Sequence, residues 1–228
     1  MRVPVMNSNF VSKQPAECRF CGYLAGRHST HEADYPWVQN DDYAALVSVG
    51  ALVPGWSLVC PVTHAFNLSR DFSSPAFWKF TDSVVDTCTS LHGPIRVFEH
   101  GACAAESLTS CGTAHAHLHI VPLDFSLVNE AVAFDPTRTW QNCRVTEIAR
   151  FASGGEYLYM ADSYDGEATE GYISLLQTGT SQFFRRVIAN KLGCADKFDY
   201  RAHPNHDMAD SSAVELRQVV ASRGRNAA

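Results

Sequence analysis

Three histidines alternate with apolar residues in the segment 115–122, whose sequence is HAHLHIVP. Successive side chains on a β-strand point to opposite faces, so a strand here would place His115, His117 and His119 on one face. Neighbouring histidines would then stand roughly 6–7 Å apart. Such a row makes poor core material, because neutral imidazoles carry polar nitrogens and charged ones repel one another. The pattern therefore indicates metal ligation, nucleophilic catalysis, or both.

Two cysteines near the start of the chain, Cys18 and Cys21, form a C-x-x-C motif. Alone, this spacing indicates a redox pair, half of a zinc site, or coincidence. A redox pair would need a thioredoxin-like βαβ context, which the surrounding sequence lacks. A structural zinc needs four ligands, so two more nitrogen or sulfur donors would have to come from elsewhere. His64, which follows an apolar run, and His115 are candidates for these two positions.

The first half of the chain predicts the elements that would position these residues. Apolar runs at 43–49 and 56–61 flank the turn sequence Val53-Pro54-Gly55, which predicts an antiparallel hairpin. A helix is expected to begin at Ser73 or Ser74, just before Pro75, and to end at the sequence HGP of residues 92–94. A strand at 95–99 and a long loop of small residues at 101–113 then lead to the histidine segment.

The second half of the chain predicts further strands and helices. Segments 156–161 and 172–177 have strand character and flank an Asp-Gly turn. Segment 180–192 is expected to form a helix with Thr180 or Ser181 as its N-cap and Gly193 just beyond its end. A weaker terminal helix is expected at 211–223.

Composition narrows the class of protein. The chain has 228 residues, of which 46% are hydrophobic and 18% charged, and this excludes a wholly disordered chain. With 18 Lys and Arg residues against 24 Asp and Glu residues, the net charge of -6 argues against a nucleic-acid partner. No apolar run approaches the ~18–20 residues that span a bilayer, so no membrane partner is expected.

The N-terminal sequence MRVPVMNSNF lacks the apolar core of a signal peptide. The eight cysteines are therefore not expected to form a disulfide framework. These two observations predict a cytoplasmic location.

The order of these motifs resembles the histidine-triad superfamily of nucleotide hydrolases and transferases. The matching stretches are CRFC, LVPGWSLVCPVTH, VFEHG and the triad HAHLHIVP, and together they cover residues 18–122. The resemblance implies an α+β fold in which a helix packs on an antiparallel sheet. It also implies a structural zinc held by Cys18, Cys21, His64 and His115.

The same resemblance implies roles for the other triad histidines. His117 would attack the α-phosphorus of a nucleotide and form a nucleotidyl-histidine intermediate, which water then hydrolyses. Its second ring nitrogen would donate to the backbone near His115. His119 would contact phosphate oxygens or the leaving group. Because transferases for hexose phosphates carry glutamine at this third position, His119 favours a hydrolase or phosphorylase.

Some positions depart from the pattern of the family. Compact members have a Gly-Gln-Ser phosphate-binding stretch before the triad, whereas residues 110–114 here read SCGTA. Gly112 and Thr113 remain candidates for phosphate contacts through a backbone N–H and a hydroxyl. Ser48 stands where the family has a ribose-binding acid. His100 is either a substrate-binding residue or an exposed loop histidine.

The resemblance divides the chain into three parts. Residues 1–17 are expected to form a flexible arm, residues 18–122 the catalytic domain, and residues 123–228 an α/β extension packed on that domain. Within the extension, Gln182 or Arg185 would complete the substrate site at a helix N-terminus. The alternative is an ordinary amphipathic helix with a solvated arginine pair.

The resulting hypothesis is a hydrolase that cleaves a small nucleotide at its α-phosphate and releases a nucleoside monophosphate. One alternative is a phosphorylase or nucleotidyltransferase with the same chemistry. Another is a zinc-stabilised nucleotide-binding protein without turnover. A deadenylase of nucleic-acid ends is disfavoured by the acidic charge balance. Compact relatives pair as homodimers, so the resemblance also implies that this chain could form a homodimer. The extension of residues 123–228 would either preserve or cover the dimer interface.

Overall fold

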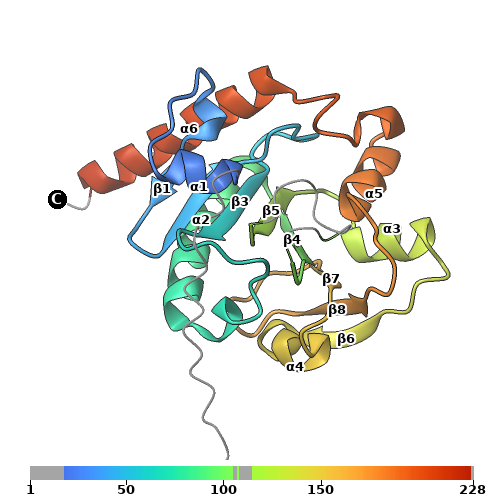
Figure 1. Cartoon of the computed structure of the whole chain (residues 1–228). Helices are drawn as coiled ribbons and strands as arrows, with labels where there is room; N and C mark the ends of the chain where they lie inside the picture. The colour runs from blue at the N-terminus through green and yellow to red at the C-terminus, as the bar shows by residue number, and fades with distance from the viewer. Residues whose placement is uncertain (1–17, 105–106, 108–114, 227–228) are drawn as a thin grey trace, which may run out of the picture.

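The computed structural model describes residues 18–104, 107 and 115–226, so the expected arm and the candidates Gly112 and Thr113 lie outside the described residues. Within them, eight strands form one sheet in which every neighbouring pair is antiparallel. The strand order is β1-β2-β3-β5-β4-β7-β8-β6 (Figure 1). The strands are β1 (Val38–Gln39), β2 (Tyr43–Val47), β3 (Ser57–Pro61), β4 (Ile95–Gly101), β5 (Leu118–Pro122), β6 (Gln141–Arg144), β7 (Tyr157–Ala161) and β8 (Glu170–Leu175).

Helices cover both faces of this sheet, so the fold is α+β as the sequence predicted. Helices α2 and α6 pack on one face, while α3 and α5 lie side by side on the other (Figure 1). The α-helices are α1 (Arg19–Leu24), α2 (Pro75–His92), α3 (Leu127–Phe134), α4 (Ile148–Ala152), α5 (Phe183–Lys191) and α6 (His206–Asn226). None of the helices in the described part of the chain has both the length and the apolar character that crossing a membrane would require.

The alternation of side chains along the strands separates two hydrophobic cores. In β2, Ala45 and Val47 join the core under α2 and α6, whereas Ala44 and Leu46 join the core under α3 and α5. This is the period of two that a strand buried on both faces requires. On β5, His119 lies one residue from Leu118 and Ile120, which face α2. Its side chain therefore points to the α5 side of the sheet.

The hairpin and the long helix form as predicted. Strands β2 and β3 pair from Tyr43↔Pro61 to Val47↔Ser57, on either side of the expected turn. Helix α2 has Ser74 as its N-cap residue and Pro75 in its first turn. It ends at His92, and its C-cap residue Gly93 has a φ of 88°, which is accessible at little cost only to glycine.

Several expected boundaries were wrong. The terminal helix expected at 211–223 runs from His206 to Asn226, and the strand expected at 172–177 is Glu170–Leu175. The triad strand β5 begins at Leu118, because the residues before it bond to the loop after β3: the Ala116 N–H donates to the Ala65 carbonyl over 2.7 Å. Helix α5 begins at Phe183 with Gln182 as its N-cap, and not Thr180 or Ser181. Gln182 has a left-handed conformation (φ 56°), and its carbonyl accepts the Arg186 N–H.

The second half of the chain continues the sheet of the first half. Strand β7 pairs with β4 from Val97↔Ala161 to Gly101↔Tyr157, and β8 and β6 follow. The edge of β4 that faces away from β5 is therefore occupied by a strand of the same chain. The strands within 123–228 and those within 18–122 belong to one sheet.

Candidate active site and metal centre

Four metal-ligating side chains gather at one end of β3 and β5. Their ligand atoms all lie within 4.8 Å of one another, and every member except Cys18 is buried. Cys18 is the N-cap residue of α1 and Cys21 lies within that helix. His64 follows β3 and His115 precedes β5. This group could hold a metal ion.

A backbone hydrogen bond fixes the orientation of His115. Its Nε2–H donates to the Pro61 carbonyl over 2.8 Å, so its Nδ1 carries the lone pair. That Nδ1 lies 3.5 Å from the Sγ atoms of Cys18 and Cys21, and the His64 Nδ1 lies 3.3 Å from the Cys21 Sγ. Burial lowers the pKa of His115 to about 4 and also lowers the pKa of His64, so both rings are neutral at pH 7, as metal ligation requires.

Helix α1 connects the metal-ligating group to a neighbouring pocket. Phe20, between the two cysteines, packs with its ring centroid 5.6 Å from those of both His115 and His117. Arg19 and Phe20 both line the pocket. The cysteines therefore anchor a wall of the pocket as well as offering sulfur ligands.

His117 lies in the pocket with a fixed ring orientation. Its Nδ1–H donates to the His115 carbonyl over 2.6 Å, which leaves Nε2 with the lone pair. Burial lowers the pKa of His117, against a smaller opposing effect of that hydrogen bond. The ring is therefore neutral at pH 7, in the form that a nucleophile requires.

His119 is the neighbour of His117 along the same wall, with ring centroids 4.7 Å apart. The Trp56 Nε1–H donates to the His119 Nδ1 over 2.9 Å. The His119 ring stacks on Phe98 at 4.1 Å with an angle of 16° between the planes. Burial, reinforced by His117, His100 and Arg185, holds the pKa of His119 well below its usual value.

His100 also lies in this wall, on strand β4 rather than in a loop. Its ring centroid is 6.3 Å from that of His119 and 5.1 Å from that of Phe184 on α5. Burial, together with the charges of nearby groups, lowers its pKa to about 3. Three histidines thus line the pocket as neutral rings at pH 7.

Arg185 reaches the pocket from α5 and holds the loop after β2. The side chain is 3% exposed. Its Nε donates to the Phe198 carbonyl over 3.0 Å, its Nη1 to the Ser48 Oγ over 3.4 Å, and its Nη2 to the Gly50 carbonyl. The guanidinium lies 4.8 Å from the Trp56 ring centroid. A positive charge therefore sits where the resemblance placed a ribose-binding acid.

Tyr200, also from the second half, lines the pocket beside Arg185. Sequence reasoning missed this residue. Gly50 lies so close that a Cβ atom there would approach the Tyr200 Cβ to 2.4 Å. The tight packing of Gly50 against Tyr200 lets the second half of the chain complete the pocket.

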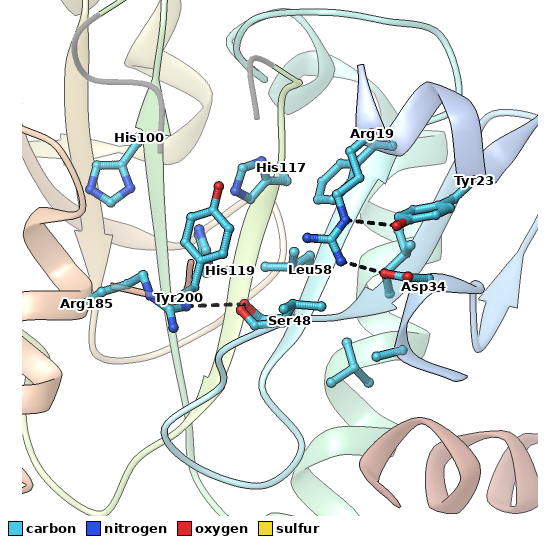
Figure 2. A pocket seen from close by; sticks show the side chains of 15 residues that line it. Arg19, Tyr23, Asp34, Ser48, Leu58, His100, His117, His119, Arg185 and Tyr200 are labelled. Atoms are coloured by element: carbon cyan, nitrogen blue, oxygen red, sulfur yellow. Dashed lines mark hydrogen bonds and ion pairs between the residues drawn. The ribbon is translucent and has the colours of Figure 1, made fainter. Parts of the chain in front are cut away.

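The opposite wall carries a polar cluster that sequence reasoning also missed. In Figure 2, Arg19, Tyr23 and Asp34 lie across the pocket from the histidines and Arg185. The Arg19 Nη2 donates to Asp34 over 2.5 Å, and its Nε donates to the Tyr23 hydroxyl over 3.3 Å. Burial tends to raise the pKa of Asp34, but hydrogen bonds from Ser29 and Arg19 hold it below its usual value. Position within C-R-F-C was the only available signal for Arg19.

Gln182 is placed differently from Arg185. Its Nε2–H donates to the Asp199 carboxylate over 3.2 Å, and its side chain is buried. Among the described residues that line the pocket, Gln182 is absent. In this structure it caps α5 and connects that helix to the segment that carries Tyr200.

Comparisons with known proteins match only at the level of structure. No protein-family model and no curated protein matches the chain. A HIT-like protein involved in cell-cycle regulation from Bartonella henselae matches 48% of this chain and 81% of its own, with 18% identity and a TM-score of 0.38. A hypothetical histidine triad nucleotide-binding protein from Sulfolobus tokodaii strain 7 matches 48% of this chain and 71% of its own, with 18% identity and a TM-score of 0.38.

A third solved structure, of a protein from Streptococcus mutans UA159, matches 51% of this chain and 74% of its own, with 17% identity and a TM-score of 0.40. The chain is thus similar, over about half of its length, to HIT-like and histidine triad nucleotide-binding proteins.

Proposed function

We propose that this chain is a nucleotide hydrolase that cleaves at the α-phosphate through a covalent nucleotidyl-histidine on His117. The observation that carries the proposal is the hydrogen bond from the His117 Nδ1–H to the His115 carbonyl. It leaves the Nε2 lone pair on a neutral ring in the pocket wall, which is what attack on phosphorus requires. The motif order resembles the histidine-triad superfamily and supports a nucleotide as the substrate.

The proposed reaction proceeds in two displacements. The His117 Nε2 bonds to the α-phosphorus, and the bond from phosphorus to the leaving group breaks, with the electron pair departing on that group. Water then attacks the phosphorus and the P–N bond breaks. The products are a nucleoside monophosphate and neutral His117, and the proton of the water passes to solvent. Positive charge from Arg185 and N–H groups in the pocket would offset the charge on the phosphoryl oxygens.

We propose zinc as the metal of the four-residue group. A tetrahedral zinc with Zn–S near 2.3 Å and Zn–N near 2.0–2.1 Å places sulfur and nitrogen ligands about 3.6 Å apart. The observed sulfur–nitrogen distances of 3.3 and 3.5 Å fit that value. Four protein ligands complete a tetrahedral site, so the zinc would be structural, and would hold α1 against the segments that carry His64 and His115.

The test is a panel of dinucleoside polyphosphates, nucleotide sugars and nucleoside phosphoramidates, each with and without inorganic phosphate. Wild type, His117→Ala and the exposed-histidine control His28→Ala would be compared by product mass. We expect wild type and His28→Ala to release a nucleoside monophosphate and His117→Ala to release none. A nucleoside diphosphate formed only with phosphate present would identify a phosphorylase. Binding of a monophosphate with no turnover of any compound would contradict the hydrolase.

A further inference from the structure

Trp56 and His119 form a hydrogen bond in which only Trp56 can be the donor. The indole Nε1–H is a donor and never an acceptor. Because it lies 2.9 Å from the His119 Nδ1, that nitrogen must accept. The single proton of the neutral His119 ring is therefore on Nε2.

Packing prevents this ring from turning. Trp56 is fully buried and His119 is 5% exposed. Phe98 stacks on one face of the imidazole, and the Trp56 ring meets it at 69° with a centroid distance of 5.8 Å. Among the described residues, no hydrogen-bond partner is found for the buried Nε2 of His119. An N–H donor is thus held in the pocket wall beside His117, with capacity for a ligand oxygen.

The same hydrogen bond restricts what His119 can do with its proton. Loss of the Nε2 proton would leave an imidazolate, which is not reached near neutral pH. Gain of a proton at Nδ1 would set two N–H groups against each other. The positively charged Arg185 and the titratable rings of His117 and His100 face His119 and further disfavour an imidazolium.

We infer that Trp56 is a positioning residue that holds His119 as a permanent N–H donor to a phosphoryl oxygen and excludes it as a general acid or base. This inference rests on the proposed function. His119 keeps its proton through both displacements, so the site suits leaving groups that depart as stable anions. A phosphate or polyphosphate leaves with the bonding electron pair and needs no proton, whereas an amine does. Phosphoanhydrides are therefore the preferred substrate class over phosphoramidates.

The hydrogen bond is tested without any substrate. Long-range proton–nitrogen NMR of the full chain loaded with zinc would report the tautomer of His119 between pH 5.5 and 8, with the signal assigned through His119→Gln. We expect the Nε2–H tautomer throughout in wild type. In Trp56→Phe, loss of one hydrogen bond would shift the tautomer ratio about fivefold toward Nδ1–H. An Nδ1–H tautomer in wild type would overturn the inference, and this holds even if Trp56→Phe does not fold.

A matched control separates the hydrogen bond from a general loss of packing. Trp78 is also buried, and its Nε1–H donates to the Phe72 carbonyl over 3.0 Å on the other face of the sheet. Trp78→Phe should leave the His119 tautomer unchanged. An equal shift in both variants, or none in Trp56→Phe, would contradict the positioning role.

The substrate class is tested by kinetics on wild type. A phosphoanhydride should be cleaved faster than the phosphoramidate of the same nucleoside at every pH from 6 to 8. Faster cleavage of the phosphoramidate would overturn this part of the inference. Turnover of neither compound would defeat the proposed function, while the NMR result would still decide whether Trp56 fixes the His119 tautomer.

Discussion

His115 and His117 are two residues apart, and both rings donate one N–H to a backbone carbonyl, yet they offer different nitrogens. His115 donates through Nε2 to Pro61 and turns its Nδ1 toward the two cysteines. His117 donates through Nδ1 to the His115 carbonyl and keeps its Nε2 lone pair at the pocket. The metal-ligating group and the pocket thus each contain a histidine, but the nitrogen that donates to the backbone is Nε2 in His115 and Nδ1 in His117. The carbonyl that each ring reaches determines which nitrogen is left with a lone pair, and with it whether the ring is a candidate ligand or a candidate nucleophile.

Of the variants that test this difference between His115 and His117, His117→Ala is expected to have the largest effect. His117→Ala should lower kcat/KM by at least about 10⁴-fold, because the proposed nucleophile is lost. Metal content and melting temperature should stay near those of wild type, since the ring is not among the four candidate ligands. Steady-state kinetics and elemental analysis on the same preparation would check this. Residual activity above one per cent of wild type would contradict the assignment of the nucleophile.

The next effect is at the metal-ligating group. Cys18→Ala should release the metal and lower the free energy of unfolding by at least about 3 kcal/mol. For a chain of this size that corresponds to a fall in melting temperature of roughly 6–12 °C. Calorimetry and metal analysis would measure both, with the exposed Cys103→Ala as the control. Stoichiometric metal retained in Cys18→Ala would rule out the proposed site.

Arg185 tests whether the second half of the chain belongs to the pocket. Arg185→Lys should lower kcat/KM about 10- to 100-fold. One ammonium cannot reproduce the three directed N–H donors that bond to Phe198, Ser48 and Gly50 beside the pocket. The adjacent and exposed Arg186→Lys is the matched control and should have little effect. Equal kinetics for the two variants would mean that Arg185 serves the fold alone.

A smaller effect is expected from pH. The nucleophile must be neutral, and burial lowers the pKa of His117 in the folded protein. Activity should therefore be level above that pKa and fall about tenfold per unit as the pH drops through it. The acid limb should lie below pH 6.5, the usual value for histidine. An acid limb centred above pH 6.5 in a profile of kcat/KM would contradict a buried, neutral His117.

The smallest effect is expected at the wall opposite the histidines. Tyr23→Phe removes the hydroxyl that accepts the Arg19 Nε–H, while the ion pair with Asp34 remains. We expect KM to rise a few-fold, in line with about 0.5–1 kcal/mol for one partly exposed hydrogen bond, with kcat unchanged. A lower kcat in Tyr23→Phe would contradict this expectation and would mean that the cluster of Arg19, Tyr23 and Asp34 acts on the reacting atoms.

The elements with local signals were predictable from the sequence. Pro75 and Gly93 mark the two ends of α2, and the Pro-Gly turn places β2 against β3. Local signals failed for α1, which has only 6 residues and has a cysteine as its N-cap residue. They also failed at Gln182, because its left-handed conformation accompanies burial of the helix end and a side-chain bond to Asp199.

The contributions of the second half to the pocket had no local signal. Tyr200 reaches the pocket only because the chain returns to the loop after β2, where the Gly50 N–H donates to the Pro204 carbonyl and Asn205 donates to the Ala51 carbonyl. Such contacts join residues more than 150 positions apart. Periodicity along the chain carries no information about them.

The sequence by itself determined the candidate side chains, which are the alternating histidines and the C-x-x-C pair. It also determined the elements with clear start and stop signals. The resemblance to the histidine-triad superfamily implied the His117 hydrogen bond, whose partner is a carbonyl two residues away. Only the tertiary structure decided which nitrogen carries the proton in His115 and His119. Pro61 reaches His115 across 54 positions and Trp56 reaches His119 across 63. The position of the proton on an imidazole depends on the partner that folding brings to each nitrogen. Here the partners are Pro61, the last residue of β3, and Trp56, the residue just before the first residue of β3.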